Sequence, residues 1–103
     1  MRKGKMPETM YRASRLCRVL GNPGAYLVLR RLGAGRWTPG GLAAALGVSR
    51  AAVSQTLRDL RLADLVRYET QGLNRWYWIK DRAVGKVLDA LERLVETMRR
   101  KHF

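Results

Sequence analysis

The residues whose types and spacing could do chemistry lie together between positions 49 and 58. Ser49 is a good N-cap, and Val53, Leu57 and Leu60 follow at steps of four and three, which predicts a helix with one apolar side. The other side carries only small or polar residues, namely Arg50, Ala51, Ser54, Gln55 and Arg58. Arginine can donate two hydrogen bonds to a guanine edge, and glutamine can pair with adenine. This side is therefore predicted to read base edges in a major groove.

The segment Leu42–Leu57 has the pattern of two helices joined by a tight turn. Ala43 is small where the helices must cross closely, and Gly47 suits a turn that needs a positive φ. Val48 is predicted to be a buried plug after the turn, and Val53 the inward anchor of the second helix. These features predict a helix-turn-helix over residues 39–61. The alternative, that the polar side is only a solvated helix surface, does not account for the turn, plug and anchors.

After Leu65 the pattern changes to that of a β-hairpin. Leu65–Thr70 and Arg75–Ile79 are predicted strands around a turn at Gln71–Asn74, and together they form a wing over residues 65–79. Trp76, Tyr77 and Trp78 alternate in direction, and the two tryptophans are predicted to pack against the core or Trp37. Further predicted DNA contacts lie in the wing and at the start of the helix-turn-helix: Thr38, Arg67, Gln71, Asn74 and Arg75.

The first and last predicted helices carry apolar stripes that one small domain cannot cover. The first helix begins near Pro7 and ends at Gly21, and the last occupies residues 81–101. A helix of about 20 residues spans about 30 Å, so the last stripe is predicted to contact a second copy. The alternative is a stripe that belongs only to the intrachain core. The predicted dimer contacts are Met10, Cys17, Val84, Val87, Leu88, Leu91, Leu94, Val95 and Met98.

The remaining sequence gives one domain without repeats or linkers. Asn22-Pro23 and Thr38-Pro39 each read as a cap followed by a first-turn proline, opening a second and a third helix. Residues 1–6 are predicted to be a basic N-terminal arm, and residues 7–103 a single winged-helix domain. The expected fold class is mainly α with a small β-hairpin wing, an α+β winged helix-turn-helix.

Charge supports a nucleic-acid partner. The 103 residues carry a formal net charge of +13. Up to position 58 there are eleven Lys or Arg and one acidic residue, so +10 of that charge lies in this part. Solubility alone needs less, and double-stranded DNA is the preferred partner. An anionic membrane is disfavoured because arginines interrupt the first apolar stretch and no run of about 18 apolar residues occurs. A cytoplasmic location is expected.

Catalytic, cofactor and metal sites are not predicted. The chain has one cysteine, Cys17, and one histidine, His102, and it lacks a glycine-rich phosphate loop. These residues provide no nucleophile with a base and no set of three or four metal ligands. Cys17 is expected to be a buried structural thiol, and the alternative is a redox-sensitive thiol near a dimer axis.

The order of motifs resembles the ArsR family of winged-helix repressors. The resemblance covers roughly residues 20–81 and is carried by Leu20-Gly21-Asn22-Pro23, Leu29–Leu32, the helix-turn-helix, Leu60–Arg67 and Trp76-Tyr77-Trp78. It implies an elongated homodimer with first and last helices at the two-fold axis. It also implies a repressor on a palindromic operator, often released by a signal.

The chain departs from the family where metals are usually sensed. Arsenic, cadmium and lead sensors of the family carry paired cysteines on the third helix, whereas this chain reads Thr38-Pro39-Gly40-Gly41-Leu42. Zinc and nickel sensors carry histidine and acidic ligands on the last helix, where this chain has Asp89 and Glu92 but no histidine before His102. No metal site is therefore expected, and the effector is unknown. Two other functions remain open: an architectural DNA-binding protein with little sequence preference, and a winged-helix protein-interaction module. The mixed polar helix face disfavours the first, and the charge disfavours the second.

Overall fold

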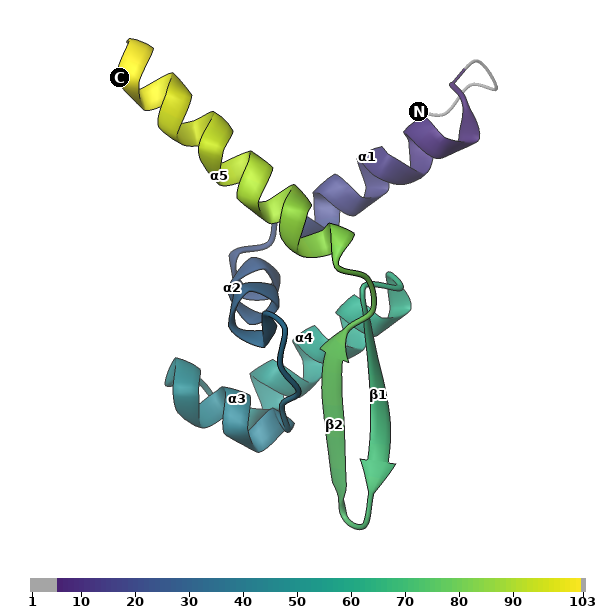
Figure 1. Ribbon diagram of the computed structural model, residues 1–103. Helices are drawn as coiled ribbons and strands as arrows, with labels where there is room; N and C mark the ends of the chain where they lie inside the picture. Colours follow the sequence, from purple (N-terminus) through teal and green to yellow (C-terminus); the bar gives the residue numbers. More distant parts are fainter. Residues whose placement is uncertain (1–5, 103) are drawn as a thin grey trace.

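The computed structural model of the protein describes residues 6–102, so the predicted basic arm lies almost wholly outside the described residues. The order of elements is the predicted one, with a hairpin between the fourth and fifth helices (Figure 1). The elements are α1 (Glu8–Leu20), α2 (Pro23–Leu32), α3 (Pro39–Leu46), α4 (Arg50–Leu62), β1 (Val66–Gln71), β2 (Asn74–Ile79) and α5 (Ala83–His102). The predicted winged helix-turn-helix fold is confirmed.

Side-chain caps fix where α2, α3 and α4 begin. Asn22, Thr38 and Ser49 each accept a hydrogen bond from the backbone N–H three residues later, at 3.0 Å. Each bond satisfies one of the N–H groups that a helix leaves without an intrahelical partner. The caps predicted at these positions are therefore present.

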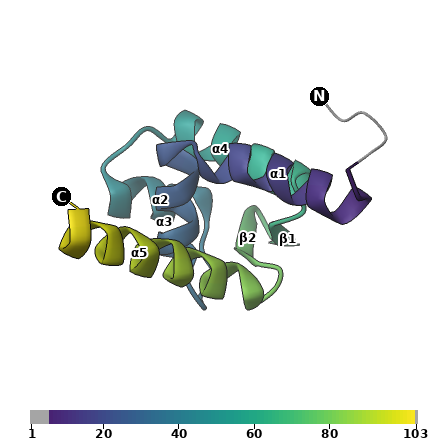
Figure 2. The same cartoon turned by 90° about the horizontal axis from the view of Figure 1, so that it is seen from above.

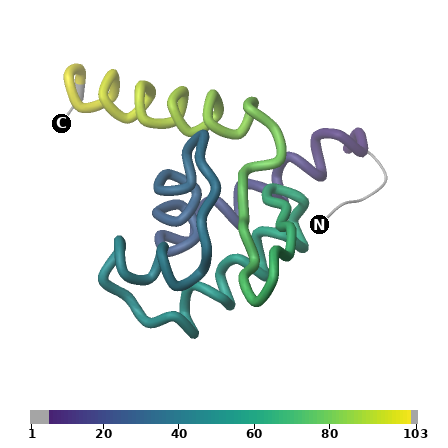
Figure 3. Tube along the Cα trace, turned by 60° about the horizontal axis from the view of Figure 1, so that its bottom comes forward, coloured from purple at the N-terminus to yellow at the C-terminus, as the bar shows by residue number. Residues whose placement is uncertain are grey.

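The elements divide into two sides of the molecule. The helices α3 and α4 and the tip of the hairpin lie on one side, and α1 and α5 diverge on the other (Figure 1). Seen from above, α1 and α5 lie over the remaining elements (Figure 2), and the turned trace again has α5 opposite α3 (Figure 3). Any surface formed by α3, α4 and the wing is thus separated from any surface formed by α1 and α5.

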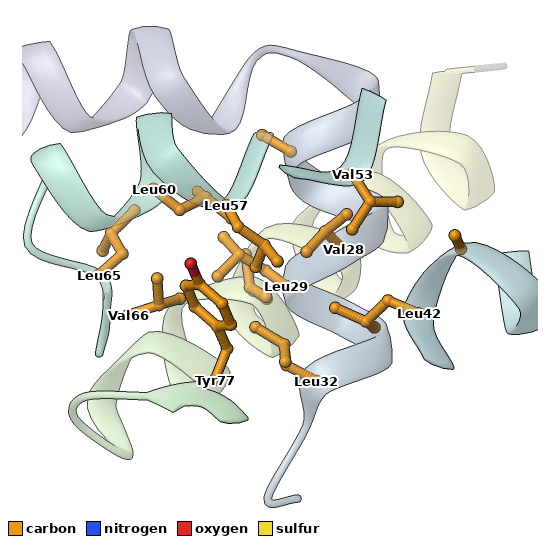
Figure 4. Packing of buried hydrophobic residues seen from close by; sticks show 13 residues of the cluster. Val28, Leu29, Leu32, Leu42, Val53, Leu57, Leu60, Leu65, Val66 and Tyr77 are labelled. Atoms are coloured by element: carbon orange, nitrogen blue, oxygen red, sulfur yellow. The ribbon is translucent and has the colours of Figure 1, made fainter. Parts of the chain in front are cut away.

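The core is aliphatic and holds α4 against α2 and the hairpin (Figure 4). Its fully buried members include Leu29 of α2, Leu57 of α4 and Val66 of β1. Tyr77 of β2 is 6% exposed and closes the core on the wing side. Leu88 of α5, predicted at a dimer interface, is instead 1% exposed in this core. It faces the body of its own chain, which leaves almost none of its surface for a second copy.

Two predictions about burial were wrong. Val48 is not a plug, because its side chain is 44% exposed. The turn before α4 is made by the backbone instead: Gly47 has a φ of +68°, and the Val48 N–H donates to the Ala43 carbonyl at 3.1 Å. Cys17 is not a buried thiol, since α1 buries none of its residues in the single chain and Cys17 is exposed.

The hairpin is longer and its turn tighter than predicted. Strand pairing continues to Gln71 and Asn74, which leaves only Gly72 and Leu73 in the turn. Gly72 has a φ of +62° and Leu73 has no positive φ, as a type II′ turn requires. At the base, Trp37 and Tyr77 exchange two backbone hydrogen bonds of 3.0 and 2.7 Å. These bonds fix the wing relative to the connection between α2 and α3.

Candidate DNA interface

Four arginines converge on a groove between α4 and the wing, which we call the arginine groove. It has a volume of about 450 Å³. Its lining consists of Pro39, Arg50, Ser54, Arg58, Arg61, Leu73, Arg75 and Tyr77. The α4 residues follow one another at steps of four, four and three, which keeps them on one side of the helix. Arg75 comes from β2, on the strand face that also carries Tyr77 and looks toward α4.

The charge of the arginine groove is not neutralised within the chain. Among residues 6–102, none of its four arginines lies within 4.0 Å of a carboxylate oxygen, whereas Arg30, Arg36 and Lys80 elsewhere are paired. A phosphate that binds in the groove therefore displaces no protein carboxylate, and only water and counterions have to leave.

Tyr68 positions two of these arginines. The guanidinium of Arg75 lies 4.7 Å from the centre of the Tyr68 ring, and that of Arg61 lies 5.7 Å from it. These are cation–π distances, so the tyrosine holds both side chains at the mouth of the groove. The pKa of Arg75 is raised above its ordinary value, first by the hydrogen bond to Tyr77 and then by Tyr68.

The beginnings of α3 and α4 add hydrogen-bond donors beside the groove. The hydroxyl oxygens of Thr38 and Ser49 accept the capping bonds, which leaves each O–H group to donate outward. A β-carbon at Gly40 would lie 3.7 Å from Nη1 of Arg50, so this guanidinium packs over the first turn of α3. Helix N-termini and hydroxyl donors are suited to phosphate oxygens.

Gln55 and Ala51 lie on the neighbouring side of α4 and are exposed. The amide nitrogen Nε2 of Gln55 donates to Asp59 Oδ1 at 3.1 Å, one turn later. This bond leaves the Oε1 atom of Gln55 accessible. The NH₂ group of Gln55 has a second hydrogen, so Gln55 can pair with both polar atoms of an adenine edge while it keeps the bond to Asp59.

The structure brings together most of the residues predicted to contact DNA, but not Arg67. In the hairpin register Arg67 is opposite Trp78, whereas Tyr68 is opposite Tyr77, so Arg67 points to the far face of the wing. Trp78 on that face is covered by the guanidinium of Arg36 at 4.1 Å and not by Trp37. Gln71 and Asn74 are exposed beside the turn, as predicted.

Sequence reasoning missed Arg61 and Leu73. Arg61 comes three residues after Arg58 and seven after Ser54, so its helical spacing could have placed it on the same side of α4. The sequence around Leu73 does not indicate a role at the DNA interface, because an apolar residue is usually assigned to a core. The position of Leu73 in a two-residue turn is evident only from the strand pairing.

Other kinds of site are not supported by the described residues. Between positions 6 and 102 there is no group of three or more His, Cys, Asp or Glu side chains placed to hold a metal ion. Within the same range, no helix has the length and apolar character needed to cross a bilayer.

The chain is similar to known DNA-binding regulators. A family described as a helix-turn-helix domain matches residues 13–69. No curated protein sequence matches the chain significantly. The crystal structure of NolR from Sinorhizobium fredii is 30% identical, with a TM-score of 0.75, over 84% of this chain and 87% of that one.

Two further structures share the fold over nearly the whole chain. The transcriptional regulator HlyU from Vibrio vulnificus is 26% identical, with a TM-score of 0.74, over 91% of this chain and 98% of that one. The homodimeric winged helix-turn-helix DNA-binding domain of Mb0332 from Mycobacterium bovis, a possible ArsR-family regulator, is 21% identical. Its TM-score is 0.76, over 98% of this chain and 96% of that one. The chain belongs to the helix-turn-helix domain family and is a DNA-binding transcriptional regulator.

Proposed function

We propose that the protein is a repressor that binds a palindromic operator as an elongated homodimer. The observation that carries this proposal is an apolar face on α1 and α5, on the opposite side of the molecule from the arginine groove (Figure 1). Within this proposal the protein acts in the cytoplasm, has no catalytic residues and needs no cofactor.

The apolar face of α5 is exposed in the single chain. Leu91, Val95 and Met98 are 39%, 50% and 43% exposed, and Val87 and Leu94 belong to the same side of the helix. On α1, Met10 is 57% exposed and Cys17 is also accessible. Rows of exposed apolar side chains of this kind are uncommon on a monomer and are typical of an interface between chains. All the predicted dimer contacts except Leu88 and the half-buried Val84 are exposed here.

Ion pairs hold α5 in a fixed position on its own chain. Arg30 of α2 donates to Asp89 at 2.6 Å and to Glu92 at 2.7 Å, and the Tyr26 hydroxyl donates to Glu92 at 2.6 Å. The pKa of Glu92 is lowered by the bond from Arg30 and, second, by the bond from Tyr26, so the carboxylate stays charged at neutral pH. With α5 oriented this way, Leu91, Val95 and Met98 remain exposed beyond the contact with α2 and are available to a partner.

A second copy of this chain is the occupant that fits the face. Two-fold symmetry places two identical α4 helices so that each can enter a major groove one helical turn of DNA from the other. The structure of Mb0332, which shares the fold, is a homodimer. One chain alone has a single α4 and a single wing, too small a surface for a specific operator in a genome.

Three measurements test this proposal. Multi-angle light scattering is expected to give twice the mass of the chain, and selection from a random duplex pool to give an inverted repeat. A promoter with that repeat at its start site is expected to be silenced when the protein is expressed. A monodisperse monomer, a selected pool without two-fold symmetry, or activation of the promoter would each contradict the corresponding part of the proposal.

Arg75→Ala is expected to weaken binding to every DNA sequence by a similar factor. Its guanidinium lines the arginine groove on the wing side and lies 4.7 Å from the centre of the Tyr68 ring. Each lost phosphate contact reduces the slope of log K against log salt by about 0.9, so a dimer should lose about 2. Titrations at several salt concentrations measure this slope, with Arg67→Ala as the control on the far face of the wing. An unchanged slope, or a changed consensus, would contradict a phosphate contact at Arg75.

Zinc, cadmium, nickel and arsenite are expected to leave operator affinity unchanged at micromolar concentrations. A soft or borderline metal needs three or four thiolate, imidazole or carboxylate ligands. Residues 6–102 of one chain place no three such side chains together, and the carboxylates of Asp89 and Glu92 are already paired with Arg30. Titration of each ion against a labelled operator, with wild type and Cys17→Ser, measures this. A tenfold shift that is lost in Cys17→Ser would reveal a site shared between subunits.

A further inference from the structure

Leu73 at the tip of the wing is a fully exposed apolar side chain. Its relative exposure is 103%, the highest of the large apolar residues in the described part of the chain. It occupies the second position of the two-residue turn, after Gly72, and contributes no packing to its own chain. Intrachain stability therefore gives no reason for leucine here, where a polar residue would be better hydrated.

The position of Leu73 on the DNA-facing surface follows from the arginine groove. The lining of this groove includes Arg58 and Arg61 of α4, Arg75 of β2 and Leu73 at the tip of the wing. When α4 lies in a major groove, the phosphate strand beside it comes next, and beyond that strand lies a minor groove. In that arrangement the three arginines would face the phosphate strand, and the wing tip would reach the minor groove.

We propose that Leu73 is a minor-groove wedge that inserts between two base pairs at the edge of each half-site. Leucine is among the side chains that proteins use to unstack a base step and kink the duplex. The neighbours of Leu73 suit the same groove. Gln71 and Asn74 are exposed beside the turn and can hydrogen-bond to the acceptors that A·T pairs present there.

The wedge would also determine specificity at positions that α4 does not reach. Pyrimidine–purine steps such as TA and CA/TG unstack and kink most easily. The selected operator is therefore expected to carry such a step under each wing, outside the bases read by Arg50. The inference rests on the proposed function, because it assumes an operator with a wing at each end.

The experiment compares wild type, Leu73→Ser and Leu73→Met on the selected operator. Leu73→Ser is expected to lower affinity about tenfold, because it removes an apolar contact with the bases in each half-site. It should also reduce DNA bending, measured by energy transfer between dyes at the two ends of the duplex. Leu73→Met keeps an apolar side chain of similar volume and should retain affinity and bend. The salt slope should stay the same in all three proteins, which separates a wedge from a lost phosphate contact.

Each outcome has a defined meaning. If wild type binds the operator but Leu73→Ser binds and bends it equally well, the wedge is wrong while the proposed function stands. If wild type selects no operator, the proposed function fails first. Because Leu73 makes no intrachain contact, Leu73→Ser is expected to unfold at the wild-type temperature. A lowered unfolding temperature would instead assign Leu73 to the stability of the hairpin and overturn the wedge.

Discussion

Leu91→Glu is expected to convert the dimer into a folded monomer and to abolish tight operator binding in the same protein. Leu91 is 39% exposed at the middle of the apolar stripe of α5, and in the proposed dimer two-fold symmetry would bring the stripes of both chains together. The substitution would bury two unpaired carboxylates in an apolar interface, which costs several kcal/mol. Binding to two linked half-sites raises the affinity about 10²- to 10⁴-fold over binding to one, and a monomer loses this increase in affinity.

The control is Arg93→Glu, which lies two residues further along α5 on an exposed side away from the apolar stripe. This variant changes the charge by more than Leu91→Glu does, so a general repulsion from DNA would appear in it first. Light scattering gives the mass, circular dichroism the fold, and operator titration the affinity. A Leu91→Glu protein that remains dimeric, or a monomer that binds the full operator as tightly as wild type, would contradict the assigned interface.

Arg50→Ala is expected to have the largest effect on sequence preference. Arg50 lies in the first turn of α4, and its guanidinium packs over Gly40 at the start of α3. Removing one bidentate arginine–guanine pair costs about 1–3 kcal/mol of discrimination, and a symmetric operator contains two such pairs. Affinity for the selected operator should therefore fall by about 30-fold or more, while affinity for unrelated DNA falls only slightly.

Arg67→Ala is the matched control for Arg50→Ala. Both variants remove one arginine from each chain, but Arg67 is on the face of the wing that points away from the arginine groove. Competition titrations with operator and random duplexes give the two affinities for each protein. If Arg50→Ala and Arg67→Ala weaken both duplexes equally, Arg50 contributes only charge. If Gln55→Ala leaves the selected consensus unchanged, Gln55 has no role in reading bases.

Much of the fold could be predicted because its signals are local. Asn22, Thr38 and Ser49 cap helices through bonds to residues three positions away, so neighbouring sequence already contains both partners. The turn at Gly47 also depends on a local requirement, a positive φ, that glycine meets most easily. Helical spacing alone predicts that Arg50, Ser54 and Arg58 share one polar side of α4, and the structure has all three in the lining of the arginine groove.

The failures concern burial and direction, which depend on residues far away in the sequence. The stripe on the last helix could not show that Leu88 turns inward while Leu91 stays exposed, because this depends on where α2 docks through Arg30. Val48 was predicted to be buried because it follows a turn, yet no element covers it. The face on which Arg67 lies depends on the register of the hairpin, and a shift of one residue would reverse it.

The sequence by itself determined the kind of protein: a basic helix-turn-helix with a wing and two apolar terminal helices. It did so because helix caps, turn glycines and apolar periodicity act over a few residues, and net charge does not depend on folding. Only the tertiary structure decided which groups act together. Arg61 and Arg75, fourteen positions apart, meet over the ring of Tyr68, and Leu73 reaches the end of the groove that they line. That convergence arises from packing α4 against the hairpin, a long-range event whose geometry no short segment encodes.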